Sequence, residues 1–207
     1  RIVSLGGTVS LTSAAPNWIP TNLRGTLPFT SRIRIIENLT NVPADLLVEL
    51  KSLKKLRKLG IGGEDVTDAK MKHINELTQV EILTIINAPV TDAGLQQLNS
   101  MTNLWSIYLF DLRITDDGLK NLSNLPRLRD IGVHDQPLTD AGLEHLRKIP
   151  QLEELWIEGP GVTDAGLDQL TGLSVLRRLN LHETNTTPEG RNRLRASVPQ
   201  CHISPVP

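Results

Sequence analysis

The sequence predicts an α/β solenoid, in which stacked repeats each contribute one short parallel strand and one short helix. A hexapeptide such as VTDAGL recurs along the chain, and the threonines of its copies are 24 residues apart. Two apolar spacings accompany it, L-x-x-L-x-L before most copies and leucines three residues apart after them. A fixed period of this length is typical of a solenoid, because one unit alone cannot bury its own apolar residues. The threonines that set the period are Thr67, Thr91, Thr115, Thr139 and Thr163.

Residues 1–31 precede the repeats and do not follow their period. Pro16, Pro20 and Pro28 favour loops in this segment. We expect an N-terminal cap here, because the first repeat would otherwise leave one end of the apolar core open to water. Within the cap, the stretch IVSLGGTVSL predicts a helix end at its two glycines, followed by a strand.

About seven repeats occupy residues 32–199, and the repeat at 104–127 shows their pattern. Its first apolar group has the two-residue alternation of a strand, and its second has the three-residue spacing of a helix. Thr115 begins the helix, because a threonine oxygen caps free backbone N–H groups and the aspartates after it favour the positive helix end. The two apolar groups are Leu104, Ile107 and Leu109, and Leu119, Leu122 and Leu125.

A glycine recurs inside the first turn of four predicted helices, where it costs about 1 kcal/mol relative to alanine. We expect each glycine to be needed for close approach of the neighbouring helix. These residues are Gly94, Gly118, Gly142 and Gly166.

Residues 200–207 complete the chain, and we expect them to form a C-terminal cap strand and a tail. Ile203 is in phase with the buried strand positions, and Cys201, the single cysteine, lies in the same cap. An internal disulfide is excluded, because it needs two cysteines.

The repeats resemble the leucine-rich repeat family, which combines L-x-x-L-x-L strands with a helical return. The T-D-A-G-L helix start is most similar to a variant found in bacterial leucine-rich repeat proteins, and to the cysteine-containing subclass. The resemblance covers roughly 32–203. It implies a bacterial source and a right-handed β–α superhelix, with parallel strands on the concave face and short helices on the convex face. For function it implies only a binding scaffold.

Composition excludes several classes of function. The formal net charge of −1 and the absence of a basic stripe disfavour nucleic acid as a partner. No apolar run approaches the roughly 18–20 residues of a membrane helix, so we expect no membrane insertion by this segment. No phosphate-binding loop, G-x-S-x-G, H-E-x-x-H or C-x-x-C motif occurs, and we expect neither catalysis nor a cofactor. The chain begins at Arg1, which we interpret as a fragment or processed product, and its compartment is not indicated.

Aromatic residues mark the candidate binding site. The chain has Trp 3, Tyr 1 and Phe 2, and four of these six are predicted to project from the concave strand face. Exposed apolar patches are typical of binding sites, and Trp and Tyr are favoured anchors. We therefore expect a protein or peptide ligand, with acidic residues of the later strands tuning specificity. The predicted binding residues are Trp105, Tyr108, Phe110, Trp156, Ile82, Ile86, Asp130, Glu154 and Glu158.

Packing of the aromatics on one another, or under the N-terminal segment, is the competing interpretation of this patch. A narrower hypothesis concerns Gly132, which lies between Tyr108 and Trp156 in the repeat alignment and would leave a slot for a ligand.

Two other functions stay open. The domain could be a structural spacer or assembly element of a larger, surface-attached protein, although we expect a monomer. Least favoured is a metal or carbohydrate site near His134 and His182, because these histidines lie two strands, roughly 9–10 Å, apart.

Overall fold

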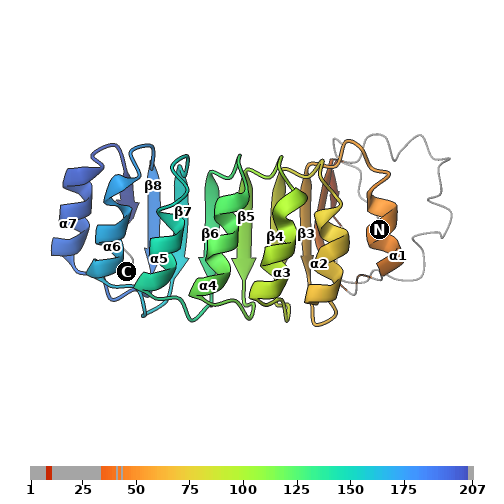
Figure 1. Cartoon of the computed structure of the whole chain (residues 1–207), viewed down its shortest axis with the longest axis horizontal. Helices are drawn as coiled ribbons and strands as arrows, with labels where there is room; N and C mark the ends of the chain where they lie inside the picture. Colours follow the sequence, from red (N-terminus) through yellow and green to blue (C-terminus); the bar gives the residue numbers. More distant parts are fainter. Residues whose placement is uncertain (1–7, 11–33, 41, 43, 205–207) are drawn as a thin grey trace.

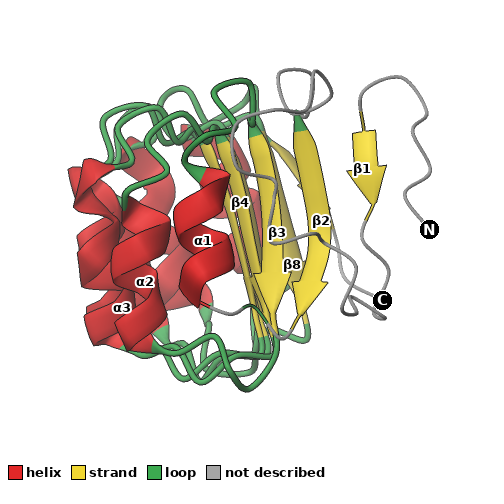
Figure 2. Cartoon of the chain, turned by 90° about the vertical axis from the view of Figure 1, so that its right-hand side faces the viewer, coloured by secondary structure: helices red, strands yellow, loops and turns green. Residues whose placement is uncertain are grey.

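The computed structural model describes residues 8–10, 34–40, 42 and 44–204. Its strands form a single parallel sheet of nine in chain order, β1 to β9. The helices line up along one side of this sheet (Figures 1 and 2). This arrangement confirms the predicted α/β solenoid. We call the opposite side, which corresponds to the predicted concave face, the sheet face.

The strands β3 to β8 are five residues long each, whereas β2 has six residues and the terminal strands β1 and β9 have three. The strands are β1 Thr8–Ser10, β2 Ile35–Thr40, β3 Lys58–Gly62, β4 Ile82–Ile86, β5 Ser106–Phe110, β6 Asp130–His134, β7 Glu154–Glu158, β8 Arg178–His182 and β9 His202–Ser204.

The returns are short helices, three of which continue into a 3₁₀ turn. The helices are α1 Ala44–Leu50, α2 Asp68–Asn75, α3 Asp92–Gln96, α4 Asp116–Leu119, α5 Asp140–Leu146, α6 Asp164–Gln169 and α7 Pro188–Ser197, with 3₁₀ turns η2 Gln97–Ser100, η3 Lys120–Asn124 and η4 Leu170–Gly172.

Paired residues on neighbouring strands are 24 residues apart in the sequence, which is one repeat. Tyr108 is the register partner of Thr84 on one side and of Gly132 on the other, and Gly132 pairs in turn with Trp156. Equivalent residues of successive repeats therefore form straight rows across the sheet.

The core contains the apolar residues that the spacing predicts. In the repeat at 104–127, all six predicted core residues are at most 1% exposed. At the C-terminal end, β9 lies at the predicted last strand, and Ile203 and Cys201 are buried. Burial raises the pKa of the Cys201 thiol to about 11, so this thiol stays protonated and unreactive at neutral pH.

At the N-terminal end, β1 pairs in parallel with β2 and extends the sheet by one strand. It lies within the stretch for which a strand is predicted. The remainder of the predicted cap, including the expected helix end and the three prolines, lies outside the described residues.

The recurring threonines and aspartates form a ladder of hydrogen bonds along the helix side. Thr139 is the N-cap of α5, and its hydroxyl accepts a hydrogen bond from the backbone N–H of Ala141. Its own N–H and hydroxyl donate to the two carboxylate oxygens of Asp116 in the preceding repeat, at 2.9 and 2.6 Å. The same two bonds link Asp68 to Thr91, Asp92 to Thr115, Asp140 to Thr163 and Asp164 to Thr187.

Each aspartate of this ladder therefore joins two repeats, in addition to lying in the first turn of its own helix as predicted. In the last joint, the hydrogen bonds from the Thr187 hydroxyl and backbone N–H hold the pKa of Asp164 below its usual range. Such bonds favour the charged carboxylate.

The recurring glycine makes room for this aspartate. A Cβ built on Gly142 would lie 2.5 Å from Oδ1 of Asp116, and one on Gly166 would lie 2.3 Å from Oδ1 of Asp140. The glycine is thus required for close approach, and the group that approaches is the carboxylate of the repeat before. Lys70 occupies the glycine position in α2, and the preceding repeat has Ala44 where the others have aspartate.

Candidate binding face

Three rows of side chains lie on the sheet face, because the repeats pair in register. The first row is Lys58, Ile82, Ser106, Asp130, Glu154 and Arg178; the second is Gly60, Thr84, Tyr108, Gly132, Trp156 and Asn180; the third is Gly62, Ile86, Phe110, His134, Glu158 and His182.

Tyr108 is held by a buried polar group. Its hydroxyl donates a hydrogen bond to Oδ2 of Asp130 at 2.7 Å, and the Ser106 hydroxyl donates to the same oxygen at 2.8 Å. Asp130 is only 7% exposed, and its Oδ1 has no hydrogen-bond partner among the described residues. Asp130, predicted to tune specificity at the surface, instead fixes the orientation of Tyr108 from below.

The pKa values of Asp130 and Tyr108 are both raised above their usual ranges. Burial raises the pKa of Asp130 above its usual range, although the hydrogen bonds from Tyr108 and Ser106 oppose that shift. Burial also raises the pKa of Tyr108, and the neighbouring Asp130 adds to the effect. The tyrosine therefore remains a neutral donor throughout the physiological range.

The slot predicted at Gly132 is occupied by the protein itself. A Cβ on Gly132 would lie 2.3 Å from Cδ1 of Tyr108 and 2.8 Å from its Cε1. The absence of a side chain thus lets the tyrosine ring lie against the β6 backbone, and the hypothesis of an open slot is wrong.

A stacked series of rings continues from Tyr108. Its ring lies 6.3 Å from that of Phe110, and the Phe110 ring lies 4.7 Å from that of His134, with interplanar angles of 13° in both pairs. Ile82 and Ile86 lie on the adjacent strand β4, both partly exposed. Packing of aromatics on one another, the competing interpretation, therefore describes part of the predicted patch.

The two tryptophans differ from these rings. Trp105 is 40% exposed and Trp156 is 37% exposed, whereas Tyr108 and Phe110 are half-buried. Neither tryptophan belongs to the stacked ring pairs found in the described part of the chain. Trp156 is the middle residue of β7, and Trp105 directly precedes β5.

Trp105 interrupts a row of ion pairs. At the equivalent position in other repeats, Arg57 pairs with Glu81 at 2.9 Å and Arg129 pairs with Glu153 at 3.0 Å. Trp105 lies between these pairs in the alignment of the repeats.

The acidic residues predicted for the later strands are mostly neutralised by neighbours. Glu154 pairs with Arg178, and Glu153 contacts both Arg129 and Arg177. The face consequently presents fewer free carboxylates than the sequence indicates, so these residues have less charge available for tuning specificity.

Glu158 is the exception, because its neighbours are histidines. Its carboxylate oxygens lie 3.1 Å from Nδ1 of His134 and 3.3 Å from Nδ1 of His182. The two histidines predicted to be too far apart thus meet at the glutamate between them. Glu183, which follows His182, adds a second carboxylate to this group.

Sequence reasoning did not find the Asp130–Tyr108 bond or the histidine contacts. The signal for the first was available, since Tyr108 and Asp130 lie on adjacent strands, one pleat apart, and Gly132 leaves space between them.

No helix in the described part of the chain has both the length and the apolar character that a membrane span requires.

No protein-family model and no curated protein matches this sequence. Solved structures do match. An internalin C2 from Listeria monocytogenes is similar over 86% of this chain and 73% of its own, with a TM-score of 0.63 and 19% identity. A leucine-rich repeat protein of Leptospira interrogans is similar over 85% of this chain with a TM-score of 0.58 and 16% identity, and this chain spans only 50% of its length. Together with the nine-stranded parallel sheet and its one-sided helices, these matches show that the chain has the leucine-rich repeat fold.

Proposed function

We propose that this chain is a non-catalytic domain that binds a protein or peptide through its sheet face. The observation that carries the proposal is the exposure of Trp105 and Trp156. They are two of the four large hydrophobic residues that are strongly exposed in the described part of the chain. Neither tryptophan side chain belongs to the buried core. Exposed apolar side chains are typical of binding sites, and tryptophan is enriched in binding hot spots.

The surroundings of each tryptophan support an apolar anchor site. Trp105 stands where neighbouring repeats have ion-paired arginine and glutamate. Trp156 adjoins Gly132, whose missing side chain is covered by the Tyr108 ring. A ligand side chain that packs on the exposed Trp156 and on the partly exposed Tyr108 ring would contact a tyrosine already fixed by Asp130, so little conformational entropy would be lost on binding.

The ligand we propose presents apolar side chains and few charges. Glu154 and Asp130 are both engaged within the domain, so their part in binding is indirect: each holds a neighbour in place. Ile82, Ile86 and Phe110 would contribute contact area, with Glu158 at the edge of the surface.

Selection of peptides tests this proposal without knowledge of the natural partner. We expect binders selected on the intact chain to lose affinity at least about tenfold when Trp105 or Trp156 is changed to alanine. Val175→Ala is the matched control, because Val175 is 40% exposed but lies in the turn before β8. Circular dichroism would confirm that each variant is folded. Equal binding by the wild type and both tryptophan variants would refute the sheet face as the site.

The spacer or assembly hypothesis predicts a different result. Light scattering over a range of concentrations would then show self-association, edge to edge, in the absence of any foreign partner. We expect a monomer.

We also propose that the repeats belong to the bacterial 24-residue variant, similar to the cysteine-containing subclass. The 24-residue period and the T-D-A-G-L helix starts support this assignment, and the aspartate–threonine ladder gives the physical reason why the motif recurs.

A further inference from the structure

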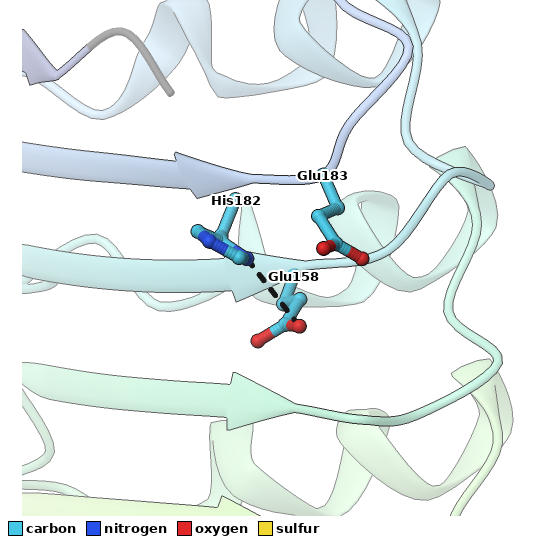
Figure 3. A group of neighbouring side chains, drawn as sticks. All are labelled: Glu158, His182 and Glu183. Carbon is cyan, nitrogen blue, oxygen red and sulfur yellow. Dashed lines mark ion pairs between the residues drawn. The ribbon is translucent and has the colours of Figure 1, made fainter. Parts of the chain in front are cut away.

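A group of histidine and glutamate side chains lies where three neighbouring strands end. His134, Glu158 and His182 are the last residues of β6, β7 and β8, and Glu183 follows His182. Figure 3 shows the Glu158, His182 and Glu183 side chains and the ion pair between the first two. One ligand atom from each of these three residues lies within 4.8 Å of the other two.

These separations fit a metal site after small side-chain movements. Nitrogen and oxygen ligands lie about 2.0–2.2 Å from zinc, so ligand atoms of one tetrahedral site are about 3–4 Å apart. His182 and Glu183 are exposed, and their side chains can adjust without disturbing the core.

The charges around this group are compatible with a bound cation. Glu154 and Glu153 on the same face each have an arginine partner. By contrast, Glu158 pairs only with histidines, and Glu183 takes part in no ion pair within the described ranges. Two carboxylates this close repel each other, and a cation bound between them would remove that repulsion.

His134 supports the site from the opposite side. Its Nδ1 contacts Oε2 of Glu158, while His182 contacts Oε1. His134 is also stacked on Phe110, which restricts the orientation of its ring. A ligand carboxylate fixed in this way by a second residue is typical of metal centres.

We propose that Glu158, His182 and Glu183 bind a divalent transition-metal ion of the zinc class, with His134 positioning Glu158. A mixture of imidazole and carboxylate ligands favours zinc over magnesium or calcium, which prefer oxygen ligands alone. Three protein ligands leave one coordination position of a tetrahedral ion open. Glu158 lies two residues after Trp156 on β7 and so borders the proposed peptide surface, but zinc binding is measured without a peptide and the proposal does not depend on peptide binding.

Calorimetric titration of ZnCl₂ into the whole chain, without an affinity tag and in a non-chelating buffer, tests the proposal. We expect one equivalent to bind, with the affinity at least about tenfold weaker for His182→Gln and for Glu158→Gln. His202→Gln is the matched control, since His202 is exposed on β9 of the same sheet and should leave the affinity unchanged.

Imidazole nitrogen resonances give a second readout. Zinc should shift those of His182 and leave those of His202 in place. The proposal is overturned if zinc does not bind, if His202→Gln weakens binding as much as His182→Gln, or if magnesium binds as tightly as zinc. Thermal unfolding without metal would show that each variant is folded, so that a loss of zinc binding by a folded variant reports the loss of a ligand.

Discussion

The helix side and the sheet face of this solenoid are built from the same repeats but differ in how much each repeat resembles the next. On the helix side, the same aspartate, threonine and glycine recur and make the same two hydrogen bonds at successive joints. On the sheet face, equivalent positions hold Tyr108, Gly132 and Trp156, which have three different roles. The comparison indicates that the uniform side holds successive repeats together, whereas the variable side is the one for which we propose recognition.

The largest effect that tests this comparison is expected for Gly166→Ala. Its Cβ would lie 2.3 Å from Oδ1 of Asp140 and 2.7 Å from Cδ1 of Leu143, which is buried. We expect a loss of about 2 kcal/mol in the free energy of unfolding, although alanine favours helix by about 1 kcal/mol. Urea denaturation would measure it.

Gly172→Ala is the control for this prediction, since nothing lies within 4 Å of a Cβ at Gly172. Combining Gly166→Ala with Asp140→Ala should recover part of the loss, because the carboxylate that clashes is removed. Strictly additive effects of the two changes would contradict the close-approach role of the glycine.

A smaller effect is expected for Asp116→Ala, which removes both hydrogen bonds to Thr139. We expect a loss of about 1–2 kcal/mol, because the bonds involve a charged acceptor but are partly exposed to water. Asp117→Ala changes the next residue, whose side chain is 75% exposed, and should cost less than about 0.5 kcal/mol. If Asp116→Ala and Asp117→Ala lower the free energy of unfolding by similar amounts, the ladder hydrogen bonds stabilise the fold no more than an exposed surface charge does.

The smallest effect concerns the sheet face. Tyr108→Phe keeps the ring against Gly132 but removes the hydrogen bond to Asp130, and we expect a loss of about 1 kcal/mol at neutral pH. That bond favours the ionised carboxylate, so its removal raises the pKa of Asp130 further. The penalty is therefore fully present above the pKa of Asp130 in the folded variant, and it decreases as the pH falls and Asp130 becomes protonated. Unfolding curves at several pH values would measure it, and a penalty independent of pH would refute the assignment.

Much of the fold follows from the sequence, because burial in a solenoid repeats with the period. The apolar triplets, the helix starts and the strand order all depend on spacing alone, and each is found as predicted. The dual role of the aspartates was not predicted, since it requires the position of one coil relative to the next. The recurring glycine was the available indication, because glycine destabilises a helix relative to alanine and would not recur there without a packing reason.

The site was less predictable than the fold. Sequence places Trp105, Tyr108, Phe110 and Trp156 on one face, but it does not fix their rotamers. Tyr108 rotates towards Asp130 and covers Gly132, while the tryptophans stay exposed. The partners of long charged side chains across strands are likewise not fixed by the sequence pattern: Glu154 contacts an arginine, whereas Glu158 contacts two histidines.

The aspartate–glycine joint also bears on how such an array changes its length. Each unit supplies the carboxylate for the joint after it and the glycine for the joint before it, as Asp116 with Gly142 and Asp140 with Gly166 illustrate. Deleting or duplicating one whole unit between Thr91 and Thr163 would leave every remaining carboxylate facing a glycine. Such a deletion or duplication would move Trp105 and Trp156 closer together or farther apart by one strand spacing. Every joint would still pair a carboxylate with a glycine.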